Sequence, residues 1–186
     1  MKNKILTFGL IAIINIVFIS GCVQEETIPI DEELPTPPTI PASIGYIRSY
    51  DHKLGYGFEY PEDWEMHSPE EFTLGGGIEK VEMFTKKGEG TSIALIVKST
   101  NWKSLEEVKE QYGKIDPLKT TLKEDIIEVN DRKGYEIIYR SPPMKTREVV
   151  FLANGRAYTI KYSTTEDLYV ASEEIFDHVI NSFIIE

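Results

Sequence analysis

The sequence predicts an α+β fold in which a largely antiparallel β-sheet is flanked by helices. Two patterns support this class. Short segments alternate apolar and polar residues between turn signals, and two other segments carry apolar residues at helical spacing. Because the strands follow one another in runs, with helices inserted between or after them, the sheet is expected to be mainly antiparallel. A signal peptide (1–21) and a tether (22–45) are predicted to precede this folded domain (46–186).

The N-terminal segment, MKNKILTFGLIAIINIVFISGC, has the three parts of a secretory signal peptide. Lys2 and Lys4 form a basic start, residues 5–19 form an apolar run, and Ser20 and Gly21 are small. As a helix the apolar run would be about 22 Å long, which is shorter than the roughly 30 Å hydrocarbon core of a bilayer. A permanent transmembrane span is therefore the less favoured interpretation.

Cys22 is the only cysteine, so an intramolecular disulfide and a multi-cysteine zinc site are excluded. The tetrapeptide that it ends, Ile-Ser-Gly-Cys, resembles the lipobox of prokaryotic lipoprotein signal sequences. The resemblance implies that Cys22 becomes the lipidated first residue of the mature chain, held in the cell membrane on its extracytoplasmic side. Two lipid chains together make a durable anchor. The alternative is an uncleaved signal anchor with an incidental thiol. The lipobox and the many Ile and Lys residues favour a prokaryotic source and leave an archaeal one open.

The segment after Cys22 is expected to be an extended, disordered tether. Residues 23–45 hold five of the ten prolines, five acidic residues and no basic one. Prolines interrupt helices and sheets, and like charges repel one another, so the composition is typical of a linker. A proline-rich ligand for a partner domain is the alternative, although no PxxP motif has flanking arginines.

Most of the folded domain is predicted to form strands. In YGFEYPEDW three aromatic residues alternate on one face until Pro61 ends the strand. KVEMFTKKGEGTSIALIVKS is expected to form a hairpin, and its second strand is apolar on both faces, which suits a central position. Two strands, 126–130 and 135–140, flank the turn NDRKG. REVVFLANGRAYTIKYS is the clearest hairpin, because Asn154-Gly155 is the favoured type I′ dipeptide.

Two segments are predicted to be helical. The first begins with a capping box at Ser104–Glu107 and ends at Pro117. The second begins near Thr165, and the tail 183–185 can pair as a final strand. The second helix carries a broad apolar stripe that is expected to face the sheet: Leu168, Ala171, Ile175, Phe176, Val179, Ile180 and Phe183.

Three stretches, GYGFEYPEDWEM, GYEIIYR and GRAYTIKYSTTEDLYVASEEIFDHVINSF, together resemble the PsbP-like family. That family is typified by the extrinsic photosystem II subunit and includes many prokaryotic lipoproteins. The resemblance covers roughly residues 46–186. It implies an αβα sandwich, with an antiparallel sheet between helices, and a non-enzymatic accessory role on a membrane complex.

Charge and motifs exclude several classes of function. A net charge of −11 gives the chain no electrostatic reason to bind nucleic acid. The serines lack a GxSxG context, and GGGIE (75–79) lacks the spacing of a phosphate-binding loop. No catalytic residue and no cofactor are therefore predicted, and the protein is not expected to be an enzyme.

The three histidines lie in no metal-ligand spacing, so no metal site is predicted. His178 is expected to pair with Glu174 on the helix surface, four residues earlier. One cluster could hold a hard divalent cation if a hairpin brought its members together, although solvated loop positions are the simpler interpretation: Asp51, His52, Glu62 and Asp63.

Two functions are compatible with these observations. The first is a lipid-anchored extracytoplasmic accessory or binding domain that docks on a membrane protein complex. The second is a lipoprotein that binds a small ligand or a metal and works with a transporter; this alternative predicts a concave ligand site. In both, the expected partners are membrane lipid through Cys22 and a membrane protein.

Overall fold

The computed structural model describes residue 43 and residues 45–67, 76–112 and 118–186. The chain divides into two units, Met1–Thr36 and Pro37–Glu186, and all described residues belong to the second. The predicted signal peptide, Cys22 and most of the predicted tether lie outside the described residues. No helix in the described part of the chain is long and apolar enough to cross a lipid bilayer.

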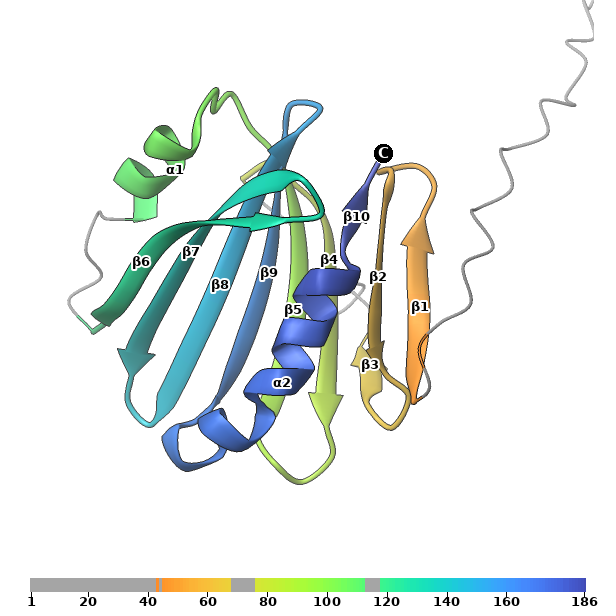
Figure 1. Cartoon of the computed structure of the whole chain (residues 1–186), viewed down its shortest axis with the longest axis vertical. Coiled ribbons are helices and arrows are strands. Elements are labelled where there is room, and N and C mark those ends of the chain that lie inside the picture. The colour runs from red at the N-terminus through yellow and green to blue at the C-terminus, as the bar shows by residue number, and fades with distance from the viewer. Residues whose placement is uncertain (1–42, 44, 68–75, 113–117) are drawn as a thin grey trace, which may run out of the picture. The chain divides into compact units, whose positions relative to one another are not determined.

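The largest element of the fold is a seven-stranded sheet in which every neighbouring pair is antiparallel (Figure 1). This sheet, with its two helices, confirms the predicted α+β class. Its strands, in spatial order, are β3 (Glu65–His67), β4 (Ile78–Lys86), β5 (Thr91–Ser99), β9 (Arg156–Thr165), β8 (Met144–Ala153), β7 (Arg132–Ser141) and β6 (Thr120–Val129).

The predicted hairpins are present. Asn154 and Gly155 have φ values of 51° and 72°, as a type I′ turn between β8 and β9 requires. The turn between β6 and β7 also uses two left-handed residues, Asn130 and Asp131. Both of these strands are longer than predicted, since β6 begins at Thr120 and β7 extends over Arg132–Ser141. The apolar alternation marks only the buried part of the pair.

A second, three-stranded sheet consists of β1 (Tyr46–Asp51), β2 (Tyr56–Pro61) and β10 (Ile184–Ile185). The predicted strand β2 lies in its centre, and the predicted final strand β10 pairs with it. Strands β1 and β3 were not predicted from the sequence. In β1 only one of six residues is fully exposed and none is fully buried, so no clean alternation marks it.

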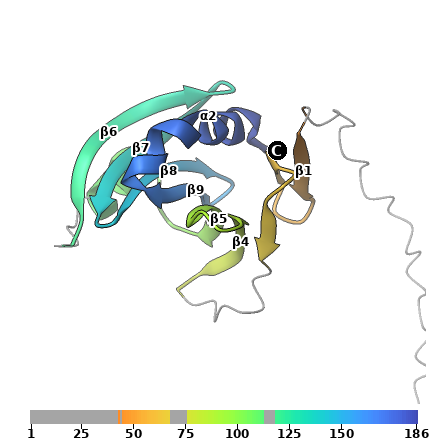
Figure 2. The ribbon, with the colours of Figure 1, turned by 90° about the horizontal axis from the view of Figure 1, so that it is seen from below.

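Helix α2 (Glu166–Ser182) covers one face of the large sheet (Figure 2). It begins after Thr165, as predicted, and Phe176 and Val179 are completely buried in the main core. The predicted stripe is wrong in one turn: Ala171 is exposed, and Tyr169 is buried instead. The Tyr169 ring centre lies 6.0 Å from that of Tyr162. This aromatic contact determines which side of the first part of α2 faces the sheet.

Helix α1 (Leu105–Tyr112) packs on the opposite face. Neighbouring residues in a strand point to opposite faces, and Val149 belongs to the core under α2 while Val150 belongs to the cluster around Val108 of α1. The Ser104 hydroxyl accepts a 3.3 Å hydrogen bond from the Glu107 amide, which confirms the predicted cap. The predicted end of the helix at Pro117 lies outside the described residues.

Candidate binding pocket between the short helix and the sheet

A cavity of about 570 Å³ lies between α1 and the sheet, within the size range of small-molecule sites. Strands β4 to β9 contribute to its wall, together with Gln111 and Tyr112 at the end of α1. Its floor is largely apolar, because Ile96, Ile137 and Ala157 point toward α1 from three different strands. The Trp102 side chain, on the loop before α1, lines one end.

A polar annex adjoins the cavity at this end. It is lined by residues 98–102, at the end of β5 and on the loop that follows, together with Gln111 of α1 and Gly155. Lys98, Trp102 and Gln111 line both spaces, so the apolar cavity and the polar annex lie side by side. Backbone hydrogen bonds of 2.9 Å, from Ser99 to Gly77 and from Thr100 to Gly155, fix the loop that forms the annex.

The middle of the cavity contains a buried carboxylate, Glu148, which is 6% exposed. Lys161 lies directly opposite it on β9, and the Lys161 ammonium is 3.4 Å from the carboxylate. The Tyr139 hydroxyl donates a 2.5 Å hydrogen bond to the same carboxylate. The charge of Glu148 is thus balanced within the protein, as a buried charge requires.

Burial raises the pKa of Tyr139, and the charge of Glu148 raises it further. Burial also raises the pKa of Tyr112 to about 12, with the same carboxylate contributing. Both phenols therefore remain protonated and can donate hydrogen bonds at neutral pH.

Two lysines at the edges of the cavity differ from Lys161. The Lys98 ammonium lies 5.9 Å from the centre of the Trp102 ring, and Lys119 lies 4.6 Å from that of Tyr139. Neither forms an ion pair among the described residues. The two carboxylates of the cavity are paired: Glu148 with Lys161, and Glu124 with Lys109 at 3.6 Å.

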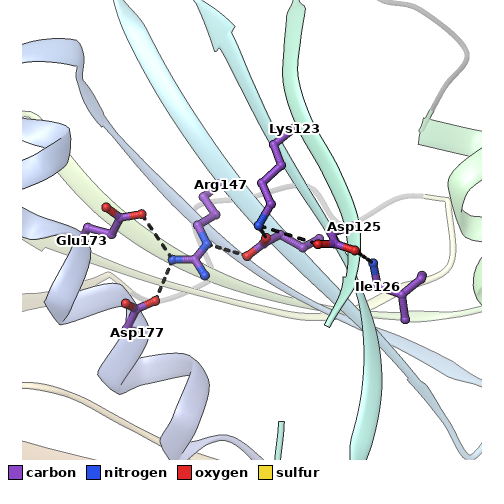
Figure 3. A network of polar contacts seen from close by, with 7 residues as sticks. Lys123, Asp125, Ile126, Arg147, Glu173 and Asp177 are labelled. Atoms are coloured by element: carbon purple, nitrogen blue, oxygen red, sulfur yellow. Dashed lines mark hydrogen bonds and ion pairs between the residues drawn. The ribbon is translucent and has the colours of Figure 1, made fainter. Parts of the chain in front are cut away.

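A separate ionic network on the other face joins the sheet to α2. Figure 3 shows Arg147 extending from the sheet toward Glu173 and Asp177 of α2. The Arg147 guanidinium also donates a 2.7 Å hydrogen bond to Glu136, which is 1% exposed. Lys123 completes the charge balance of Glu136 at 2.8 Å. The charged groups of this network pair with one another, and the network holds α2 against the sheet.

His178 does not form the predicted surface pair with Glu174. Its Nε2 atom lies 2.8 Å from the buried carboxylate of Glu59 on β2, and its ring stacks on Tyr46 at 3.8 Å. The prediction considered only the spacing within the helix. The packing of β1 and β2 against α2 instead places the Glu59 carboxylate beside His178. Arg48 approaches the same carboxylate at 2.6 Å.

The structure does not assemble the candidate cation cluster. Asp51 pairs with Tyr56 at one end of the β1–β2 hairpin, whereas Glu62 and Asp63 follow Pro61 at the other end. A six-residue strand separates these ends by about 17–20 Å. Asp51 instead binds Lys80 at 3.1 Å. The described residues contain no group of three or more His, Cys, Asp or Glu that could hold a metal ion.

The residues of the cavity were not predicted from the sequence. Glu148 could have been noticed, because it is a charged residue in the apolar strand segment REVVFLA. Its partners Lys161 and Tyr139 lie on neighbouring strands, and only the sheet register brings the three together.

Comparisons with known proteins agree with the fold. The family model described as PsbP-like protein matches residues 8–185, so this chain belongs to the PsbP-like family. A search of curated proteins finds no match.

Solved structures that share the fold include the following two. Cyanobacterial PsbP (CyanoP) from Synechocystis sp. PCC 6803 is 19% identical, with a TM-score of 0.63 over 82% of this chain and 99% of that one. PA94 from Pseudomonas aeruginosa, described as a protein of unknown function and putative regulator, is 12% identical. Its TM-score is 0.52, over 76% of this chain and 97% of that one.

Proposed function

We propose that this chain is a non-enzymatic accessory or binding domain, held by lipid on Cys22 at the extracytoplasmic side of the cell membrane, where it docks on a membrane protein complex. Membership of the PsbP-like family is the observation that carries the proposal. The match extends over residues 8–185 and so spans Cys22 as well as the folded domain. A lipid anchor keeps such a domain beside membrane partners and raises their effective concentration.

A pull-down from crosslinked membranes tests the docking. The full chain should recover the same integral membrane protein in every replicate. A Cys22→Ser variant is the control, because it removes the lipid attachment site and leaves the folded domain unchanged. Recovery should fall strongly in this variant. If the full chain recovers no reproducible membrane protein, the docking proposal is wrong.

The cavity under α1 supports a second candidate function, a lipoprotein that binds a small ligand and works with a transporter. A volume of about 570 Å³, an apolar floor and a few convergent polar groups are the usual properties of a ligand site. A small molecule that binds the folded state should raise the unfolding temperature, and the shift should grow as its concentration rises above its Kd. This candidate function would be wrong if a panel of metabolites produced no shift in the unfolding temperature.

A further inference from the structure

The cavity and its annex have different chemistry. The main cavity has an apolar floor of Ile96, Ile137 and Ala157, where a hydrocarbon or aromatic group would be shielded from water. The annex is lined mainly by polar residues at the end of β5 and on the loop that follows it. A molecule that occupies both spaces must therefore have an apolar body and a polar head.

The charge at the junction of the two spaces specifies the head. Lys98 lines both spaces and has no ion pair within the described part of the chain. The carboxylate of Glu79 nearby is already engaged by Arg156 at 3.1 Å and by Ser99. Inside the cavity, Glu148 is neutralised by Lys161. A bound anion would therefore meet a free ammonium group and no free carboxylate at this junction.

Trp102 contributes to the same position. Its ring lies beside the Lys98 ammonium, with 5.9 Å between the nitrogen and the ring centre. An anionic head that approaches Lys98 would leave the next part of the ligand in contact with the indole ring. The overall charge of −11 would repel anions, so their binding depends on this local cation.

We infer that the pocket binds a small amphipathic organic anion, with its anionic head at Lys98 in the annex and its apolar body over the floor beneath α1. This inference rests on the second candidate function and names its ligand class. Lys98 is the specificity-determining residue, because it is the cation shared by the two spaces. Lys119 lines the main cavity but not the annex, so it has no role in holding the head.

Three probes of equal chain length test the inference: decanoate, decan-1-ol and decyltrimethylammonium. Their affinities are measured by isothermal titration calorimetry on the full chain carrying Cys22→Ser, which excludes any effect of the attached lipid. Decanoate should bind at least about tenfold more tightly than either analogue. A hydrogen-bonded charge pair contributes more binding free energy than a neutral contact.

Two matched substitutions locate the head. Lys98→Met should weaken decanoate binding by about tenfold or more and leave decan-1-ol binding nearly unchanged. Lys119→Met removes a positive charge from the other end of the main cavity and should change decanoate binding by less than about threefold.

Tryptophan fluorescence gives a second measurement. Trp102 is one of two tryptophans, and the other, Trp64, is buried in the main core. Decanoate should therefore change the fluorescence of the parent chain but not of Trp102→Phe. Circular dichroism verifies that each variant is folded.

The outcomes separate the inference from the functions above. Equal binding of decan-1-ol and decanoate would overturn the anionic class but keep a small-ligand site. An equal loss in Lys98→Met and Lys119→Met would overturn the position of the head. If none of the three probes binds, the inference is wrong, and the metabolite panel decides separately whether the second candidate function stands. The docking function is judged separately, by whether Lys98→Met still recovers the same crosslinked membrane protein.

Discussion

Glu59 shows how a single buried charge joins two parts of the folded domain. Its carboxylate, 2% exposed, lies between Arg48 of β1 and His178 of α2. Burial opposes its ionisation, but hydrogen bonds from His178, Ser43 and Arg48 outweigh burial and lower the pKa of Glu59 from 4.5 to about 2. The ionised form is therefore the one that stabilises the native state.

The stability contributed by Glu59 should depend on pH. Since the pKa is lowered on folding, the contribution is complete above pH 4.5 and is lost as the pH falls toward 2. The shift corresponds to about 3 kcal/mol. Glu59→Gln should lower the free energy of unfolding at pH 7 by about this amount and flatten the acid limb, measured by urea denaturation from pH 7 to 2. Glu174→Gln, on the exposed side of α2, is the control. An acid limb that is unchanged in Glu59→Gln would contradict the assigned role.

Gly134 of β7 is required for close packing. A Cβ atom at this position would lie 2.8 Å from Cε1 of Phe151 and 3.2 Å from Cγ1 of Val149. Gly134→Ala should therefore destabilise the protein by about 1–3 kcal/mol, because the core would have to shift. Chemical denaturation measures this loss. Lys133→Ala, an exposed change on the same strand, should stay within about 0.5 kcal/mol. Equal stability of the two variants would show that the contact can relax.

At the scale of elements, Arg147 ties α2 to the sheet. It binds Glu136 within the sheet and Asp177 on the helix, both at 2.7 Å, and its guanidinium lies 5.0 Å from the Phe176 ring centre.

The long edge strand β6 has two features that protect it from pairing with another chain. A bulge interrupts it near Lys123, and the Asp125 carboxylate accepts a hydrogen bond from the exposed Ile126 amide. Both features disfavour pairing of this edge with another chain.

The interaction of Arg147 with Glu136 can be measured by a double-mutant cycle. Arg147→Met should cost about 3–5 kcal/mol, because it leaves Glu136 with only Lys123 as a charged partner. The pair Glu136→Leu and Arg147→Met should recover much of this loss, since no buried charge remains. Arg140→Met, which breaks an exposed pair with Glu166, should cost less than about 1 kcal/mol. Additive losses in the cycle would mean that the two residues act independently.

The elements that the sequence predicted are those with local signals. The turn at Asn154-Gly155 and the cap at Ser104 can be recognised from a few adjacent residues, and both are present. Strand β1 and the first half of β6 were not predicted, because their residues are mostly half-buried or exposed. Such strands form because a partner strand pairs with them, and sequence periodicity does not report that pairing.

At the scale of the whole molecule, the candidate site depends on tertiary arrangement. Lys98, Glu148 and Lys161 come from three strands, and α1 closes the space above them. No motif relates these positions, so sequence reasoning could predict the family and the fold but not the cavity. His178 illustrates the same limit, since its partner Glu59 is 119 residues away in the sequence.

The proposed function requires that the domain is held at a membrane, and Cys22 is the residue on which this depends. Mass spectrometry of the N-terminus of the mature chain tests this requirement most directly. We predict that the mature chain begins at Cys22 and carries the added mass of lipid on its sulfur. A chain that retains Met1, or an unmodified Cys22, would contradict the lipid anchor and the membrane-held function that rests on it.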